Sequence, residues 1–109
     1  MKVHKALGPG LLESAYEQCL AYELQERGMS VRRQIPLAIS YGKLKIDAAY
    51  RIDMLVAESV LVEAKAIEAL LPVHQAQLVT YLKLSGHRLG FLMNFNVPLF
   101  KNDLRRIAR

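Results

Sequence analysis

Three residues that could perform hydrolytic chemistry stand close together in RIDMLVAESVLVEAKA, which spans residues 51–66. Asp53, Glu63 and Lys65 interrupt an otherwise largely aliphatic stretch, with nine residues between the acids and one before the lysine. Mg²⁺ is commonly held by one or two carboxylates together with waters and phosphate oxygens. An ammonium group beside such an ion could lie next to the water that the ion activates. The stretch therefore contains the residue types of a metal-dependent hydrolytic site.

A β-hairpin with its loop at residues 57–59 would bring the two acids together. In this register Val56 faces Val60, Met54 faces Val62, and Asp53 faces Glu63. Like charges that face each other destabilise a sheet, and a divalent cation would compensate them. Alternation predicts one wholly apolar face that must meet the core, formed by Ile52, Met54, Val56, Val60, Val62 and Ala64. The other face carries Arg51, Asp53, Leu55, Leu61, Glu63 and Lys65.

A solvated polar face is the alternative interpretation of the same hairpin. Antiparallel sheets commonly expose one face to water, and most charged residues are exposed. From the hairpin alone, a mosaic of solvated charges is the more common arrangement. A slip of one residue in the register would also separate Asp53 from Glu63.

A helix predicted over residues 72–85 could add polar groups to this site. Gln77 and Tyr81 are four residues apart and share one face of it, and His74 lies three residues before Gln77. Alternatively, Tyr81 is a core residue with a hydrated hydroxyl and Gln77 caps a nearby group. His74, near the helix start, is more typical of a surface or packing residue than of a ligand.

Glu13 is a further candidate, in the first turn of a helix predicted to begin at residues 8–10 and to end before Gly28. An acid in that position is favoured by the helix dipole and could cap the first amides. Glu13 also lies along the stripe of Tyr16, Leu20 and Leu24, which we expect to face the sheet.

The elements that must position these residues predict an α/β fold. Strands are expected over residues 31–41, 44–56, 60–66 and 89–95, and Pro36 argues for an edge strand or a bulge in the first of them. The last strand is apolar enough to be buried on both faces. The tail at residues 100–109 is expected to form a short basic helix. The order of elements indicates a small sheet flanked by helices.

Composition predicts one domain over residues 1–109, since 52% of the residues are hydrophobic. The net charge of +5 and a pI near 9.6 favour an anionic partner, either nucleic acid or a membrane surface. No apolar run is long enough to span a bilayer, which predicts no membrane segment. A single cysteine, Cys19, and the absence of a signal peptide favour a reducing, cytoplasmic location.

Five segments of the chain together resemble the GxxExxY proteins of the PD-(D/E)XK nuclease superfamily. They are GPGLLESAYE (8–17), YRIDMLV (50–56), LVEAKA (61–66), HQAQLVTYLKL (74–84) and GFLMNFNVPL (90–99). The resemblance covers nearly the whole chain and implies a restriction-endonuclease-like fold with a small mixed β-sheet. Two features depart from the family pattern: Ile52 replaces the proline that precedes the motif aspartate, and little of the chain precedes His4.

The resemblance also implies roles for residues at the site. Asp53 and Glu63 match the acids that bind Mg²⁺ or Mn²⁺, with the carbonyl of Ala64 as a possible further ligand. Lys65 matches the lysine that positions the attacking water and stabilises the developing charge. Glu13 resembles an additional helical acid, and Gln77 and Tyr81 match a Gln-x-x-x-Tyr element that lines the site of RecB-type nucleases.

The expected function is metal-dependent hydrolysis of phosphodiester bonds in nucleic acid. Seven basic residues outside the site could follow the nucleic-acid backbone: Arg32, Arg33, Lys43, Lys45, Lys101, Arg105 and Arg106. Two alternatives remain open. One is a non-catalytic nucleic-acid-binding or interaction module that keeps the nuclease fold, and the other is a homodimer or a subunit that needs a partner.

Overall fold

The computed structural model describes residues 13–95 and 104–108. The elements follow in the order α2 (Glu13–Glu26), β1 (Val31–Tyr41), β2 (Leu44–Val56), β3 (Val60–Lys65), α3 (Pro72–Ser85), β4 (Leu89–Asn94) and β5 (Leu104–Ala108). The start predicted for the first helix, at residues 8–10, lies outside the described residues. The other predicted bounds agree with these elements to within one or two residues, apart from the tail.

The five strands form one sheet in the order β1-β2-β3-β4-β5. Strands β3 and β4 are parallel, and all other neighbours are antiparallel, so the sheet is mixed as predicted. Parallel neighbours need a crossover connection, and α3 supplies it. The placement of β1 at an edge agrees with the prediction from Pro36, because an edge strand tolerates a residue that lacks an N–H donor.

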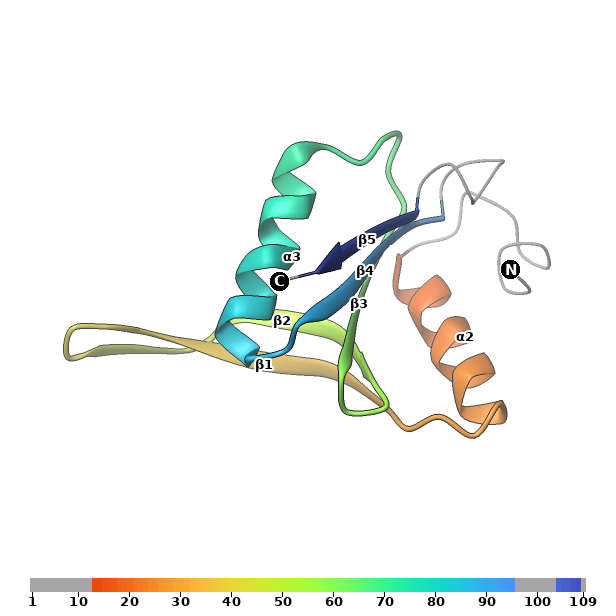
Figure 1. The fold of residues 1–109 in the computed structure, drawn as a ribbon, viewed down its shortest axis with the longest axis horizontal. Coiled ribbons are helices and arrows are strands. Elements are labelled where there is room, and N and C mark those ends of the chain that lie inside the picture. Colours follow the sequence, from red (N-terminus) through yellow and green to blue (C-terminus); the bar gives the residue numbers. More distant parts are fainter. Residues whose placement is uncertain (1–12, 96–103, 109) are drawn as a thin grey trace.

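The two helices cover opposite faces of the sheet (Figure 1). On the α2 side, Tyr16 and Leu20 pack against Met54, Val62 and other apolar residues, and the ring of Tyr16 stacks on Phe95 with centroids 4.6 Å apart. On the α3 side, the second cluster consists of Ile52, Leu55, Leu61, Leu78, Tyr81, Leu82 and Leu92. The central strands are thus buried on both faces, which explains their nearly continuous aliphatic sequences.

The C-terminal segment corrects one prediction, because Leu104–Ala108 is a strand rather than a helix. It pairs antiparallel with β4, and Ile107 packs against the second cluster. A short helix has little stability of its own in water, whereas an unpaired β4 edge offers a complete ladder of backbone hydrogen bonds. Tertiary pairing therefore decides this segment.

Ile52 corrects a second prediction, since it packs with Leu55 on the α3 side rather than with Met54 on the α2 side. The strand partners of Ile52 and Met54 are Ile35 and Arg33, and the residue between those partners, Gln34, has a φ of 54°. A non-glycine residue in this left-handed region breaks the regular pleat. The faces along β2 change between Ile52 and Met54, next to Asp53 and opposite this irregular position of β1.

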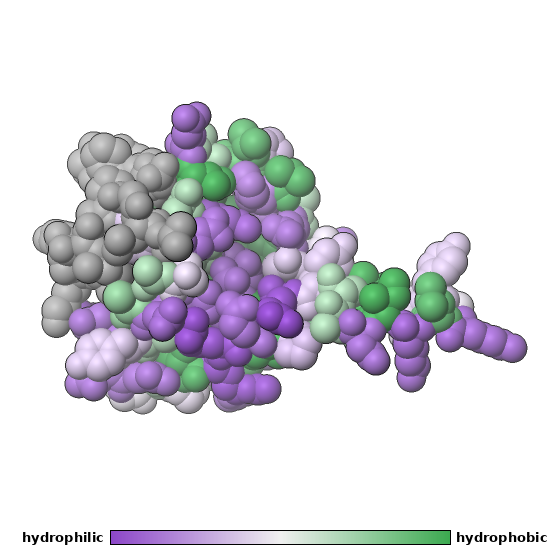
Figure 2. Space-filling model, turned by 180° about the vertical axis from the view of Figure 1, so that it is seen from behind, coloured by the Kyte–Doolittle hydropathy of each residue, from purple (hydrophilic) through white to green (hydrophobic). Residues whose placement is uncertain are grey.

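The outer parts of β1 and β2 extend beyond both helices as a two-stranded arm (Figure 1). The apolar side chains of Tyr41, Leu44 and Ile46 are 80%, 57% and 44% exposed there. Figure 2 shows hydrophobic residues on part of one edge of the arm and hydrophilic side chains along the other. No helix among the described residues is both long enough and apolar enough to span a membrane.

Candidate active site

The two acids of the hairpin are linked to each other's strand by hydrogen bonds. The predicted register is confirmed for Met54 with Val62 and for Val56 with Val60. One residue further along, the backbone N–H of Asp53 donates to Oε1 of Glu63 at 3.0 Å. The backbone N–H of Ala64 donates to Oδ2 of Asp53 at 2.9 Å. Each carboxylate therefore serves as the acceptor for an amide of the opposite strand, and these bonds hold the two acids close together where the β2–β3 ladder ends at Met54 and Val62.

Glu63 is buried, with only 4% of its surface exposed. Burial raises the pKa of its carboxyl to about 8, and the nearby charge of Asp53 adds to this effect. The pKa of Asp53 is also raised, first by burial and then by the charge of Glu17, while the hydrogen bond from Ala64 opposes the shift. The interpretation of this face as a solvated charge mosaic is therefore wrong for Glu63, although Arg51 is exposed.

Lys65 ends β3 beside this acid pair and is half-buried. Its positive charge lowers the pKa of both Asp53 and Glu63, although burial outweighs this effect. Its ammonium group makes no hydrogen bond or ion pair with another described residue. The backbone of Lys65 is held in place, because it pairs with Asn94 of β4 and its carbonyl accepts the N–H of Phe95 at 2.8 Å.

Glu13 begins α2 and reaches the chain just beyond β3. Its Oε1 accepts the backbone N–H of Ala66 at 3.2 Å, and its side chain is exposed. Glu13 therefore lies at the rim of the site, where it contacts the residue that follows Lys65. One oxygen of its carboxylate is used to hold the segment that follows β3.

Glu17, one helical turn after Glu13, is a site residue that sequence reasoning missed. It is 4% exposed, and it accepts hydrogen bonds from Nε of Arg33 at 3.1 Å and from Nε2 of Gln34 at 2.9 and 3.0 Å. Its negative charge raises the pKa of Asp53. A signal was present, because Glu17 precedes Leu20 and Leu24 by three and seven residues and so shares the stripe that faces the sheet.

The helix α3 brings Tyr81 and Gln77 to the other side of the acid pair. Tyr81 is buried, and its pKa is raised to about 12 by burial and then by the charges of Glu63 and Asp53. Its ring lies 5.4 Å from that of Tyr50, measured between centroids. Gln77 and Lys65 line one cavity between α3 and the sheet. Tyr81 therefore lies near both acids, and Gln77 shares the cavity with Lys65.

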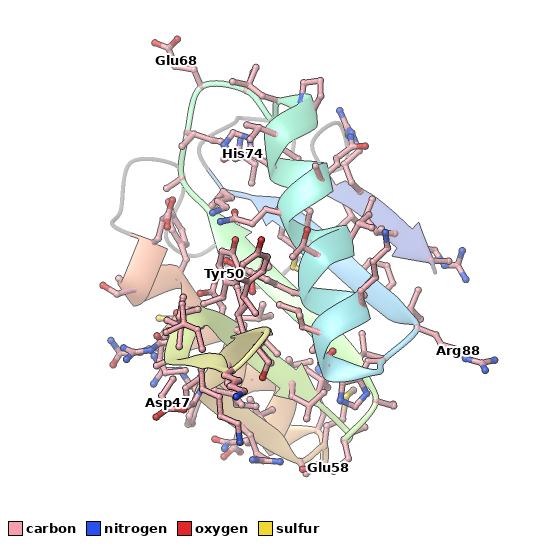
Figure 3. All side chains as sticks on the ribbon, turned by 90° about the vertical axis from the view of Figure 1, so that its left-hand side faces the viewer. Asp47, Tyr50, Glu58, Glu68, His74 and Arg88 are labelled. Atoms are coloured by element: carbon pink, nitrogen blue, oxygen red, sulfur yellow. The ribbon has the colours of Figure 1, made fainter. Side chains whose placement is uncertain are left out.

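His74 has a local structural contact at the start of α3. Its Nδ1 accepts the backbone N–H of Leu71 at 2.9 Å, which satisfies an amide at the start of α3. Figure 3 shows His74 and Tyr50 on the same side of α3. Both residues also line the cavity that contains Lys65 and Gln77.

The donor set fits a hard divalent cation held partly by protein. Among residues 13–95 and 104–108, no three His, Cys, Asp or Glu side chains gather closely enough to form a metal site by themselves. Asp53 and Glu63 supply carboxylate oxygens, and a cation between them would offset the charge of Asp53, which opposes the ionisation of Glu63. Mg²⁺ and Mn²⁺ suit such a site, because they accept oxygen ligands and Mg²⁺ retains several waters.

The comparisons with known proteins identify the family. A family model described as the PD-(D/E)XK nuclease superfamily matches residues 1–107. The searches of curated proteins and of solved structures gave no match. The mixed five-stranded sheet with a helix on each face is consistent with the restriction-endonuclease-like fold of this superfamily. With its Asp, Glu and Lys placed together on one hairpin, the chain belongs to the PD-(D/E)XK nuclease superfamily.

Proposed function

We propose that this protein is a metal-dependent nuclease that hydrolyses phosphodiester bonds of nucleic acid. The observation that carries the proposal is the mutually linked pair of half-buried Asp53 and buried Glu63 beside Lys65 in a member of a nuclease superfamily. Burying two carboxylates side by side is unfavourable, and structural reasons alone rarely retain such an arrangement. Perturbed acids of this kind are typical of functional sites.

Asp53 and Glu63 are the residues that would hold Mg²⁺ or Mn²⁺, with the carbonyl of Ala64 as a further oxygen. The bound ion would polarise the scissile phosphate and lower the pKa of a water. The ammonium group of Lys65 then orients that water and stabilises the negative charge that develops on the phosphate. Glu13, Gln77 and Tyr81 line the site and position the substrate around it. No covalent intermediate with the protein is required.

The finer family assignment is part of the proposal. Glu13 and Tyr16 are the acid and the tyrosine of the pattern Gly10-x-x-Glu13-x-x-Tyr16, which is typical of GxxExxY proteins. Tyr16 is buried against Phe95, and Glu13 contacts the chain after β3, so both have defined roles where α2 begins. We also propose that residues 1–109 act as one nuclease-like domain in the cytoplasm, which the match over residues 1–107 and the single cysteine support.

Nucleic acid is the proposed partner, and the basic residues differ in what they can contribute. Arg33 is engaged by Glu17, and Arg32 forms an exposed ion pair with Glu58 at 3.3 Å. Lys43 and Lys45 are exposed on the arm. These lysines are therefore better candidates for phosphate contacts than the two arginines. Homodimerisation, or assembly with a partner subunit, stays a prediction.

A non-catalytic nucleic-acid-binding module is the second candidate function. It is favoured by the way Asp53 and Glu63 already accept backbone hydrogen bonds, since such acids could serve only to join β2 to β3. A module of this kind would bind nucleic acid equally well with and without a divalent cation. Metal dependence of binding and cleavage therefore separates the two candidates.

The decisive experiment is a cleavage assay with Mg²⁺ and with Mn²⁺ on plasmid, linear duplex and single-stranded substrates. Lys65→Ala is compared with wild type and with Lys83→Ala, a matched loss of an exposed lysine on α3. We expect metal-dependent cleavage that falls by about a hundredfold or more in Lys65→Ala and is unchanged in Lys83→Ala. Binding without cleavage by the wild type would favour the non-catalytic module.

A further inference from the structure

A cavity of about 520 Å³ opens beside Lys65, on the side of the sheet that α3 covers. Its wall is formed by Tyr50 of β2, by Lys65 at the end of β3, and by His74, Gln77 and Thr80 of α3. Known ligand pockets have volumes of roughly 300–1,000 Å³, so this cavity has room for a ligand the size of one nucleotide. Lys65 lines the cavity and also lies beside Asp53 and Glu63, so the cavity adjoins the acid pair.

The polar groups of the wall offer both donors and acceptors. Nδ1 of His74 accepts the N–H of Leu71, so the neutral imidazole carries its proton on Nε2 and can donate from there. The hydroxyl of Thr80 donates to the carbonyl of Ala76 at 3.1 Å, which leaves its oxygen able to accept. Gln77 has no recorded hydrogen bond with another described residue, and its amide can both donate and accept.

An aromatic surface and a cation complete the wall. The ring of Tyr50 is half-buried and is supported by the ring of Tyr81, with centroids 5.4 Å apart. Nucleic-acid bases stack on such rings, and cations follow the phosphates of the same strand. Lys65 supplies a positive charge at the end of the cavity that faces the acids. The wall thus combines a stacking surface, hydrogen-bonding groups and one cation.

We infer that this cavity receives the base of an unpaired nucleotide that adjoins the scissile phosphate, so that the enzyme acts on single strands or on unpaired positions in a duplex. The inference rests on the proposed function and specifies its substrate class. A base inside a duplex is stacked and paired, and it can enter a pocket only after it leaves the stack. That cost is lowest where the base is already unpaired, as in a single strand, a flap or a mismatch.

The test blocks the cavity without altering the acids or Lys65. Ala76→Trp places a large side chain in the cavity wall from an exposed position on α3. Leu84→Trp is the matched control, because Leu84 is exposed on the same helix but does not line the cavity. Fluorescence anisotropy, in EDTA, measures binding of 12-nucleotide DNA and RNA single strands, a blunt duplex, and a duplex with one unpaired nucleotide.

We expect the wild type and Leu84→Trp to bind the single strands and the unpaired duplex at least tenfold more tightly than the blunt duplex. Ala76→Trp should lose this preference. Tyr50→Leu should weaken single-strand binding by about five- to a hundredfold, the range that loss of one stacked base produces. Equal wild-type binding of paired and unpaired substrates, or equal behaviour of the two tryptophan variants, would overturn the inference.

Cleavage measured on the same substrates with Mn²⁺ separates the two proposals. Metal-dependent cleavage of the blunt duplex and the single strand at equal rates would support the nuclease function and overturn the unpaired-base pocket. A binding preference that Ala76→Trp abolishes, without cleavage of any substrate, would support the pocket and overturn the catalytic function.

Discussion

The carboxylates of Asp53 and Glu63 each accept a backbone amide from the strand of the other. The two hydrogen bonds, of 3.0 and 2.9 Å, occupy the place where the β2–β3 ladder would otherwise continue. The acids are therefore fixed by the backbone before any ligand binds. Such preorganisation keeps two like charges close together in a partly desolvated position, at the expense of stability when both are ionised.

The raised pKa of Glu63 predicts a pH-dependent stability of the metal-free protein. Its ordinary value of 4.5 is raised to about 8 in the folded state, so the folded protein binds more protons than the unfolded chain between these values. The free energy of unfolding therefore falls as pH rises from 4.5 to 8. Thermal unfolding in EDTA should show Tm falling by about 5 °C or more, a loss of roughly 1 kcal/mol for a domain of this size. In Glu63→Gln this part of the dependence should disappear, and an equal slope in both proteins would contradict the assigned cause.

Binding of a divalent cation should release a proton near neutral pH. With a pKa of about 8, Glu63 is largely protonated at pH 7, and it must ionise to act as a ligand. Titration calorimetry with Mn²⁺ in buffers of different ionisation enthalpy should report the release of about one proton at pH 7 and much less at pH 9. Asp53→Asn should lose most of the binding. Tight binding with no proton release at pH 7 would contradict the coupling of metal binding to the ionisation of Glu63.

Glu17 should stabilise the fold and tune the acid site at the same time. Glu17→Ala leaves Arg33 and Gln34 without their acceptor, and we expect it to lower the free energy of unfolding by about 1–3 kcal/mol. Gln18→Ala, at the exposed neighbouring position, should have little effect. Denaturant unfolding measures both variants.

Glu17→Gln retains an acceptor but removes the charge, and the pKa of Asp53 should fall, because Glu17 is one of the causes that raise it. The carboxyl carbon chemical shift of Asp53, followed against pH by NMR, reports this change. An unchanged titration of Asp53 would show that the charge of Glu17 does not reach the site.

Ile107 should contribute to stability in a way that only a C-terminal strand explains. Its side chain is half-buried against the second cluster, whereas the neighbouring Arg106 is exposed. Ile107→Ala should lower the free energy of unfolding by about 1–2 kcal/mol, less than for a fully buried isoleucine. Arg106→Ala should change it by less than about 0.5 kcal/mol. Equal effects of the two substitutions in urea unfolding would argue against the pairing of β5 with β4.

The sequence by itself determined the hairpin of β2 and β3. A period-two pattern of aliphatic residues, with a three-residue loop, permits one register that keeps Met54, Val56, Val60 and Val62 on the same face, and this register brings Asp53 and Glu63 close together. The two ends of α3 were also determined by local sequence. Pro72 suits the first helical turn, and Gly86 adopts the left-handed conformation with φ of 79°. These features depend on neighbours in sequence, and the pattern therefore predicts them.

Only the tertiary structure decided the features that depend on contacts between distant segments. Glu17 reaches Gln34 across 17 residues, the regular pleat of β1 breaks at Gln34, and β5 forms because β4 offers an open edge. The cavity between Tyr50 and α3 likewise joins segments that are far apart in the chain. The physical reason is that backbone pairing and burial each require two segments. A local pattern therefore predicts the secondary structure that a segment favours, but not the distant segment with which it pairs or packs.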